Sequence, residues 1–257
     1  MISKVLYVSR ALRGFLFFFF VFGSIGSMNE SQGILYIVPT PIGNLEDMTL
    51  RAIRILKEVD VVLCENTSVT QRLFKEYDIT TSTTVFYANT GIKNIEKIMG
   101  LLEEGKSLAL VSDAGTPTIS DPGVLLVQKI YKELPHVQVI ALPGASALTT
   151  ALSVSGISSA TFTFYGFLPH KKGRETIFKT IQTSHITSIF YESVHRIEKT
   201  LQSLTEILEP ERTIVIVREL TKIHEEVVRG SAHEVKIYFE VHKDHLRGEF
   251  VVIVHGN

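Results

Sequence analysis

The chain has 257 residues, with 26 Lys and Arg against 27 Asp and Glu, so its formal net charge is −1. Hydrophobic residues at 45% and charged residues at 21% are typical of a globular protein and exclude a disordered or collagen-like chain. The balanced charge gives no bulk attraction for a polyanion, so a nucleic-acid partner has to be inferred from a local site. One cysteine, Cys64, excludes an intramolecular disulfide and a multi-cysteine zinc site, and it fits a reducing compartment.

Residues 1–33 differ from the rest of the chain. Basic residues precede an apolar run at 14–23, and small residues and a second methionine, Met28, follow it. Three interpretations are open: an upstream start codon, a signal peptide or anchor, and an ordered hydrophobic appendage. The run is shorter than the roughly 20 apolar residues that a membrane span needs. We expect a start at Met28, because every motif described below lies after Ile34.

From Ile34 onward, short apolar runs typical of buried strands alternate with helical stretches. The expected strands are 34–40, 60–66, 107–115 and 137–144, and the expected helices are 49–57, 67–77, 94–106 and 124–134. Regular alternation predicts a parallel sheet covered on both faces by helices. We expect Thr67 or Ser68 to cap the second of these helices.

A second series of elements follows a stretch rich in Ser and Gly at 152–160. Strands are expected at 161–167, 187–193 and 248–256, helices at 175–182 and 195–208, and further elements at 212–220 and 233–240. The sequence therefore predicts two α/β domains in series. The N-terminal domain spans 34–157 and the C-terminal domain spans 158–257, with the cleft between them as the expected site.

The loop PTPIGN (39–44) follows the first expected strand. It lacks the GxGxxG pattern, and no GxxxxGK[ST] occurs in the chain. Its two prolines also remove backbone N–H donors that a phosphate would use. We therefore do not expect this loop to hold a phosphate through amides at a helix terminus.

The loop SDAGTPTISDPG (112–123) follows another expected strand. Open parallel sheets bind ligands at the carboxyl ends of their strands, so Asp113 and Asp121 are candidates to face a cationic ligand. Gly115 would let that ligand approach the backbone closely. An alternative, compatible with the first interpretation, is a turn followed by an N-cap at Ser120 or Asp121 for the next helix.

Two further segments are candidates for chemistry. In LPGASALTTALS (142–153), small residues leave room for a bulky ligand, or they allow a helix to pack closely on the sheet. IFYESVHR (189–196) places Tyr191, Glu192 and His195 at the end of an expected strand. A lone His beside an Arg is more often structural than catalytic, so the two interpretations of this segment stay open.

Seven stretches occur in the same order as in the ribosomal RNA small-subunit methyltransferase I family, which the chain resembles over essentially all of 34–257. They are LYIVPTPIGNLEDMTLRA, LVSDAGTPTISDPG, LPGASALTTALS, FYGFLPHKKGR, IFYESVHRI, VRELTKIHEE and GEFVVIV. The resemblance implies a two-domain α/β enzyme of the tetrapyrrole-methylase type that binds S-adenosylmethionine between its domains. It also implies methyl transfer to a ribose 2′-oxygen of a cytidine in the decoding region of 16S ribosomal RNA (rRNA).

The resemblance also implies site residues. By motif position, the cofactor lies against Pro41, Ile42, Ser112, Asp113, Gly115, Thr116, Ile119, Ser146, Ala147, Phe190 and Tyr191. Candidates for phosphate contacts to RNA are Lys171, Lys172, Arg174 and Arg196, with a solvated basic loop as the alternative. The resemblance does not identify the catalytic residue, for which Glu65, Asn66 and Asp113 are the candidates. No metal is expected. The expected partner is 16S rRNA within the small ribosomal subunit, and we expect a cytoplasmic homodimer without a membrane partner.

The chain departs from the usual Glu-Asp-Thr-Arg of that family, because it has Glu65, Asn66, Thr67 and Ser68 there. Asn cannot act as a general base, and Ser68 cannot pair with a phosphate as Arg would. Two alternatives to an active 2′-O-methyltransferase are therefore open: a diverged member that binds cofactor or RNA without transfer, and a related methylase acting on a small molecule. Because both residues differ, we favour a lost ion pair, so Asn66→Asp should not raise turnover and should destabilise the protein by adding an unpaired carboxylate.

Overall fold

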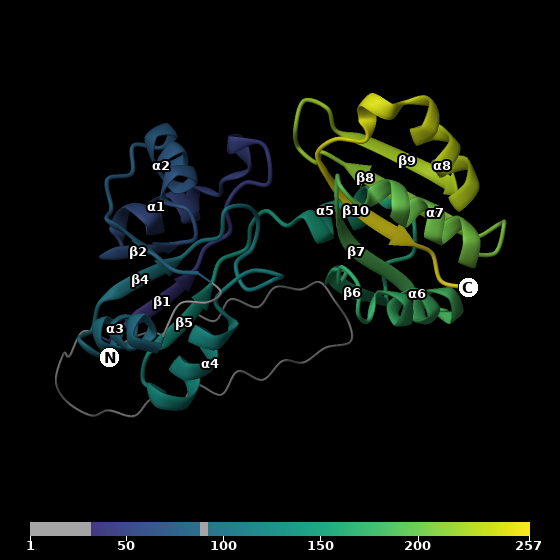
Figure 1. The fold of residues 1–257 in the computed structure, drawn as a ribbon. Helices are drawn as coiled ribbons and strands as arrows, with labels where there is room; N and C mark the ends of the chain where they lie inside the picture. Colours follow the sequence, from purple (N-terminus) through teal and green to yellow (C-terminus); the bar gives the residue numbers. More distant parts are fainter. Residues whose placement is uncertain (1–31, 88–91) are drawn as a thin grey trace, which may run out of the picture. The chain divides into compact units, whose positions relative to one another are not determined.

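The computed structural model describes residues 32–87 and 92–257 (Figure 1). The described residues all belong to one compact unit, Ser31–Asn257. The apolar run at 14–23 and Met28, with the interpretations attached to them, lie outside the described residues. Within the described part of the chain, no helix has the length and apolar character needed to cross a membrane.

The first sheet is parallel throughout and has the strand order β3-β2-β4-β1-β5. Its strands are β1 (Ile34–Ile37), β2 (Val61–Cys64), β3 (Thr83–Val85), β4 (Ser107–Leu110) and β5 (Gln138–Ala141). The connecting helices are η1 (Leu45–Asp47), α1 (Leu50–Glu58), α2 (Thr67–Glu76), α3 (Ile92–Glu103) and α4 (Val124–Glu133). The predicted parallel sheet is confirmed, and the short strand β3 is an addition to it.

Helices cover both faces of this sheet, as the alternation predicts. Helices α3 and α4 pack on one face around Leu108 of β4, and α1 and α2 pack on the other around Val62 of β2. The neighbouring strands β1 and β4 are therefore followed by helices on opposite faces. In an open parallel sheet such a switch point forms a crevice at the carboxyl ends of the strands, where ligands bind. The loops 39–44 and 112–123 begin there.

The second sheet is mixed and has the order β6-β7-β10-β8-β9, in which only β6 and β7 pair in parallel. Its strands are β6 (Phe162–Phe167), β7 (Thr187–Ser193), β8 (Thr213–Arg218), β9 (Glu226–Ser231) and β10 (Glu249–Val254). The remaining helices are α5 (Ala147–Ser155), α6 (Arg174–Thr183), α7 (Ile197–Ile207), α8 (Ala232–Val241) and η2 (Lys243–His245). The segment expected at 233–240 is thus helix α8, and β9 precedes it.

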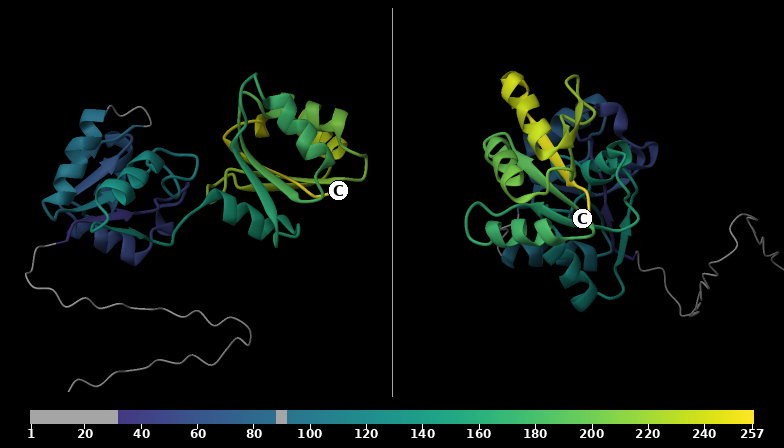
Figure 2. Two further views of the ribbon diagram at one scale, coloured as in Figure 1. Left: turned by 90° about the horizontal axis from the view of Figure 1, so that it is seen from below. Right: turned by 90° about the vertical axis from the view of Figure 1, so that its right-hand side faces the viewer.

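Helices lie on both faces of the second sheet as well (Figure 2). Helices α6, α7 and α8 pack on one face around Phe190 and Val252, and α5 packs on the other around Val217. Helix α5 precedes residue 157 in the sequence, yet its apolar side chains contact the second sheet. The division of the chain into domains at residues 157 and 158 stays a prediction.

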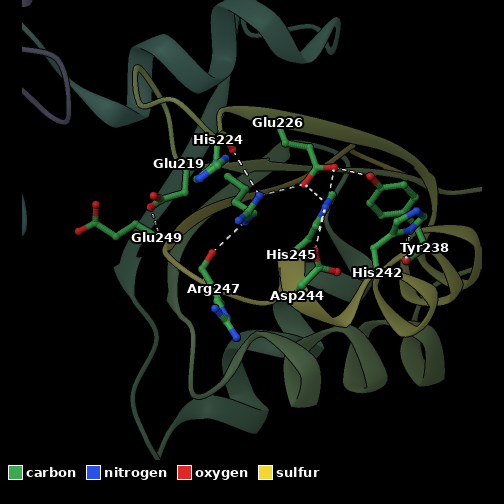
Figure 3. A network of polar contacts seen from close by, with 10 residues as sticks. Glu219, His224, Glu226, Tyr238, His242, Asp244, His245, Arg247 and Glu249 are labelled. Atoms are coloured by element: carbon green, nitrogen blue, oxygen red, sulfur yellow. Dashed lines mark hydrogen bonds and ion pairs between the residues drawn. The ribbon is translucent and has the colours of Figure 1, made fainter.

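Strand β9, at the edge of the second sheet, is held by a polar network around Glu226 (Figure 3). The Glu226 carboxylate accepts a hydrogen bond from the Tyr238 hydroxyl and lies 3.0 Å from His245 Nδ1 and 3.4 Å from Arg218 Nη1. Burial raises the pKa of Glu226, but the hydrogen bonds from Tyr238 and His245 and the charge of Arg218 outweigh burial and hold the pKa below its usual value. The network therefore joins β9 to α8 and η2 through an ionised carboxylate.

Candidate active site

Three loops of the first sheet meet at the switch point and are joined by hydrogen bonds. Thr40 and Gly115 exchange two backbone hydrogen bonds of 2.9 Å, and the Thr40 hydroxyl donates to the Ser112 carbonyl at 2.9 Å. The Thr116 hydroxyl donates to the Ala145 carbonyl at 3.0 Å. The loops that follow β1, β4 and β5 therefore hold one another in place.

The loop after β4 has an uncommon backbone conformation. Gly115 (φ 82°) and Gly123 (φ 125°) use the left-handed region that glycine tolerates, but Thr118 (φ 73°) and Ser120 (φ 67°) also lie there. Gly123 is the N-cap of α4, and no side chain caps that helix. The alternative interpretation of Ser120 or Asp121 as its N-cap is therefore wrong. Both residues line a cavity instead.

This cavity has a volume of about 540 Å³, which is in the range of small-molecule sites. The loops of the first sheet and the start of α5 contribute Ile42, Glu65, Asp113, Ala114, Gly115, Thr116, Ile119, Ser120, Asp121, Ser146 and Ala147. The second sheet contributes Phe167, Tyr191, Glu192, Ser193, Val194, His195, Val217, Leu220, Gly248, Glu249, Phe250 and Val251. Both sheets therefore take part in one candidate site.

The cavity brings together most of the residues that the family resemblance assigned to the cofactor. Those that line it are Ile42, Asp113, Gly115, Thr116, Ile119, Ser146, Ala147 and Tyr191. Pro41, Ser112 and Phe190 do not line it. Phe190 is fully buried in the core on the opposite face of β7 from Tyr191, because neighbouring side chains of a strand alternate. Ser112 is buried, and its hydroxyl donates to backbone carbonyls of its own loop.

Three carboxylates gather in the cavity: Glu65 after β2, and Asp113 and Asp121 in the loop after β4. Across 32–87 and 92–257, none of the three forms an ion pair. Burial, assisted by the charge of Asp113, raises the pKa of Asp121 to about 6. Burial also raises the pKa of Glu65, and the charges of Asp121 and Asp113 add to that effect. The site therefore carries unneutralised negative charge and suits a cationic ligand.

Tyr191 forms the aromatic side of the cavity. Its ring makes edge contacts with Phe164 and Phe167, with centroid distances of 5.0 and 5.3 Å. Burial raises the pKa of the Tyr191 hydroxyl, against a hydrogen bond with the backbone of Leu148, and the charge of Asp121 raises it further. The charge of Asp121 thus raises the pKa of Glu65, beside the first sheet, and the pKa of Tyr191, on the second sheet.

Strand β7 ends in a buried ion cluster at the wall of the cavity. The fully buried Glu192 carboxylate lies 2.9 Å from Arg174 Nη2 and 2.7 Å from Arg196 Nε. It also accepts a hydrogen bond of 2.8 Å from the Thr200 hydroxyl. Arg196 donates in addition to the Leu168 carbonyl at 2.6 Å. The cluster joins β7 to α6 and α7 and fixes the turn that follows Glu192 along the cavity.

The four basic residues assigned to RNA phosphates fall into two groups. Lys171 and Lys172 are exposed in the loop before α6. Arg174 is buried and Arg196 is half-buried, and both pair with Glu192. Lys171 and Lys172 are therefore free to remain candidates for phosphate contacts, whereas an internal carboxylate already holds the two arginines.

Asn66, and neither Thr67 nor Ser68, is the N-cap of α2. Its side-chain oxygen accepts a hydrogen bond of 3.0 Å from the Ser68 backbone amide. Asn66 is exposed and does not line the cavity, whereas Glu65 and Asp113 do. Aspartate caps a helix as well as asparagine does, and a helix N-terminus favours negative charge. The expected destabilisation by Asn66→Asp is therefore replaced by a neutral or slightly stabilising effect.

Some residues of the cavity have no counterpart in the sequence-based assignment. Phe167 is the last residue of β6, and Leu220 lies just after the end of β8. Gly248 and Glu249 lie at the start of β10. Strand pairing brings them together, and no local pattern marks them. The available signal is that each lies in a stretch shared with the family: Phe167 in FYGFLPHKKGR, Leu220 in VRELTKIHEE, and Gly248 and Glu249 in GEFVVIV.

Comparison with known proteins agrees with the sequence motifs. The family model for Tetrapyrrole (Corrin/Porphyrin) Methylases matches residues 34–236. The chain is 45% identical over 229 residues to the Ribosomal RNA small subunit methyltransferase I of Bacillus subtilis, which covers 89% of this chain and 77% of that protein. It is 43% identical over 225 residues to the protein of the same name from Thermotoga maritima, at 88% and 99% coverage.

Solved structures agree on the fold. A cobalt precorrin-4 methyltransferase of cobalamin biosynthesis matches with a TM-score of 0.62 and 17% identity, covering 89% of this chain and 97% of that chain. The uroporphyrin III C-methyltransferase of Thermus thermophilus matches with a TM-score of 0.60 and 17% identity, at 87% and 97% coverage. The predicted tetrapyrrole-methylase-like α/β fold is confirmed. With the identities above, the chain belongs to the tetrapyrrole methylases and, among them, to the ribosomal RNA small subunit methyltransferase I family.

Proposed function

We propose that this protein transfers a methyl group from S-adenosylmethionine to the ribose 2′-oxygen of a cytidine in the decoding region of 16S rRNA. The observation that carries the proposal is the cavity at the switch point, where three carboxylates stand beside apolar walls. The 43–45% identity to proteins named as small-subunit rRNA methyltransferases supports RNA as the substrate. We further propose that the RNA is methylated within the small ribosomal subunit.

The residues of the cavity fit S-adenosylmethionine, which supplies a methyl group on a positively charged sulfur when it is bound. Glu65 and Asp113 offer negative charge for that cation, and Ile42 and Leu220 offer apolar contact. Gly115 lines the same space with φ 82°, and a Cβ added there would lie 3.4 Å from Ile42 Cγ2. That distance is ordinary van der Waals contact, but the positive φ strains any residue that has a side chain, so glycine is favoured at this position.

The start of α5 suits an anionic group of the same ligand. Ser146 is the N-cap of α5, and its side chain makes no capping hydrogen bond. Ser146 also lines the cavity. A helix N-terminus favours a carboxylate, because its first amides have no partners within the helix. Positive and negative parts of one zwitterionic cofactor therefore find complementary groups in the same cavity.

On the RNA side, the exposed Lys171 and Lys172 are the proposed phosphate contacts. Such contacts position an RNA without reading its sequence. Changing both lysines to Ala should raise KM for the ribosomal subunit and leave cofactor affinity unchanged. The matched control is the double change of Lys57 and Lys75, which are exposed lysines on α1 and α2, and it should leave KM unchanged.

The deciding experiment uses methyl-labelled cofactor and small subunits from cells that lack this gene. We expect label in 16S rRNA at one cytidine, with the adjoining phosphodiester bond resistant to alkali because the 2′-oxygen is methylated. Label on a base would contradict ribose methylation. Cofactor binding by calorimetry without any label in RNA would favour a diverged binding protein. Label in a small-molecule fraction would favour a methylase of the other substrate class.

A further inference from the structure

Resting on the function proposed above, we propose that Glu192 is a positioning residue for the RNA. Its carboxylate fastens the basic loop 168–174 to the wall of the cavity, so that a phosphate bound by Lys171 and Lys172 sets which ribose enters the cavity. The two interpretations of the segment 189–196, chemical or structural, stayed open from the sequence. The proposal gives this segment a role in the reaction without making it catalytic.

Both ends of the loop 168–174 are attached to the same carboxylate. At the start of the loop, the Leu168 carbonyl accepts a hydrogen bond of 2.6 Å from Arg196 Nη1, and Arg196 Nε lies 2.7 Å from Glu192 Oε1. The loop ends at Arg174, the first residue of α6, whose Nη2 lies 2.9 Å from Glu192 Oε2. Each oxygen of Glu192 therefore holds one end of the loop, one through Arg196 and the other through Arg174.

The same carboxylate also holds a turn that forms part of the cavity wall. Ser193, Val194 and His195 make up this turn and line the cavity. Glu192 Oε1 accepts a hydrogen bond of 2.9 Å from the Ser193 amide. The Arg196 amide donates to the Ser193 carbonyl at 3.0 Å, and Arg196 Nε donates to the Ser193 hydroxyl at 3.3 Å. The turn and the basic loop are thus fixed to one group.

The basic loop begins directly at the cavity. Phe167, the residue before Leu168, lines the cavity and pairs with Tyr191 across β6 and β7. The rings of Phe167 and Tyr191 also make an edge contact with a centroid distance of 5.3 Å. Glu192 follows Tyr191 in the sequence, so the carboxylate and the start of the loop are adjacent on neighbouring strands.

Lys171 and Lys172 lie between the two attachment points, and both are exposed. The Arg174 amide donates to the Lys171 carbonyl at 3.2 Å, and Gly173 has φ 90°, so the backbone beside the lysines turns tightly. Phosphate contacts fix the register of a nucleic acid on a protein. A phosphate held at a set distance from the cavity therefore brings one particular ribose of the same strand to it.

The composition of the cluster favours defined geometry over stability. Burying charged groups costs free energy, and apolar residues of similar volume are often as stabilising or more so. Arg174 Nη1 is moreover buried without a hydrogen-bond partner in the described part of the chain. A guanidinium group binds a carboxylate in a fixed direction, which an apolar contact does not. This cluster is therefore suited to hold two segments at a set distance.

Glu192 acts through its neighbours and does not take part in the chemistry itself. A carboxylate offers about four acceptor positions. Donors from Arg174, Arg196, Ser193 and Thr200 meet the Glu192 oxygens, and the side chain is fully buried. These contacts leave the carboxylate engaged, so the loop and the turn are the parts that meet the RNA and the acceptor.

The test is Glu192→Asp, which keeps the charge but shortens the side chain by one methylene, so the carboxylate no longer meets both arginines where they stand. Turnover on ribosomal subunits should fall by about 10²-fold, the cost of misplacing a reacting group by about 1 Å. KM for the subunit and the calorimetric cofactor Kd should stay nearly unchanged, because the lysines and the loops of the first sheet are intact. Part of the methyl label should move to nucleotides beside the target.

The matched control is Arg212→Lys, at a buried arginine of the same half of the chain that does not line the cavity. Arg212 donates to the carbonyls of Ile181 and Gln182 at 2.7 and 2.6 Å. The change should lower the free energy of unfolding and leave turnover of the folded protein and the site of methylation unchanged.

A second variant keeps the proposal testable if Glu192→Asp does not fold. Arg196→Lys keeps the charge, but a lysine lacks the fork that reaches both Glu192 and the Leu168 carbonyl. Changing Lys171 and Lys172 to Ala should lower kcat/KM for the subunit less in Arg196→Lys than in the wild type, because the loop is then already detached. Additive effects would overturn the proposed link, since independent sites add.

The outcomes separate the two proposals. A Glu192→Asp protein as active and as site-specific as an active wild type overturns the role of Glu192 and leaves the function standing. An equal fall in turnover in Arg212→Lys shows a merely structural cluster and also overturns that role, as does a loss explained wholly by a higher cofactor Kd. A wild-type protein that transfers no methyl group to subunit RNA overturns the proposed function, and the role of Glu192 falls with it.

Discussion

Removing the Glu192 carboxylate should destabilise the protein strongly, because it would leave two arginines facing each other without their counter-ion. The Glu192 side chain is 0% exposed, and those of Arg174 and Arg196 are 11% and 16% exposed. Breaking a buried pair by removing one partner costs about 3–5 kcal/mol. Arg196 would keep its hydrogen bond to the Leu168 carbonyl, whereas Arg174 already has one buried nitrogen, Nη1, without a partner. We therefore expect Glu192→Gln to cost about 3 kcal/mol, at the lower end of that range.

Urea unfolding at neutral pH measures this cost. The matched control is Glu198→Gln, an exposed glutamate in the first turn of α7, which should change the free energy of unfolding by no more than about 0.5 kcal/mol. Adding Arg174→Met to Glu192→Gln should recover part of the loss, because it removes one of the two stranded charges. A loss of stability below about 1 kcal/mol for Glu192→Gln would refute the reasoning, because a loss that small is what the removal of a solvent-exposed ion pair costs.

The remaining predictions concern the cavity and the edge strand β9. Gly115→Val should weaken calorimetric cofactor binding in a folded protein, because φ is 82° and the side chain would enter the cavity, while Gly100→Ala, with open space around it, should not. Tyr238→Phe should cost about 1 kcal/mol at neutral pH, from the lost hydrogen bond to Glu226. The pKa of Glu226 is lowered from 4.5, so its stabilisation is present above pH 4.5 and is lost as the pH falls below that value. The gap in urea midpoint between the wild type and Tyr238→Phe should therefore narrow as the pH falls from 7 through the lowered pKa of Glu226, and a gap that stays constant would contradict this account.

The first sheet and its loops could be predicted from the sequence, because the patterns that indicate them are local. Apolar runs such as ILYI and VVLC are buried on both sides, and each ends in a loop rich in Gly, Pro and Asp. A parallel sheet also requires the helices between its strands, so pattern and topology agree. The site loops 39–44 and 112–123 were placed correctly for the same reason.

The second sheet was harder to predict from the sequence, because the contacts that determine it join residues far apart in the chain. The partner of Arg174 is Glu192, eighteen residues later, so a loop reading HKKGR gives no sign that this arginine is buried. Leu220 and Gly248 reach the cavity only through strand pairing. The segment 233–240 is identified as a helix by the capping box of Ser231 and Glu234. Ser231 lies before the segment, so the segment alone does not show this signal.

The departure at Asn66 is the point where the structure changes the expectation most. Asn66 caps α2 through its side-chain oxygen and lies outside the cavity, so a carboxylate there would make the same hydrogen bond without reaching the site. Asn66→Asp should therefore leave turnover unchanged and keep or slightly raise stability, since the helix N-terminus favours negative charge. Asn66→Ala, which loses the cap, should cost about 1 kcal/mol and serves as the control. Adding Ser68→Arg should be tolerated, because the cap uses only the backbone amide of Ser68. A gain in methyl transfer of about 10²-fold from Asn66→Asp alone, the size of a restored base, would show that this position takes part in the chemistry and would contradict the capping account.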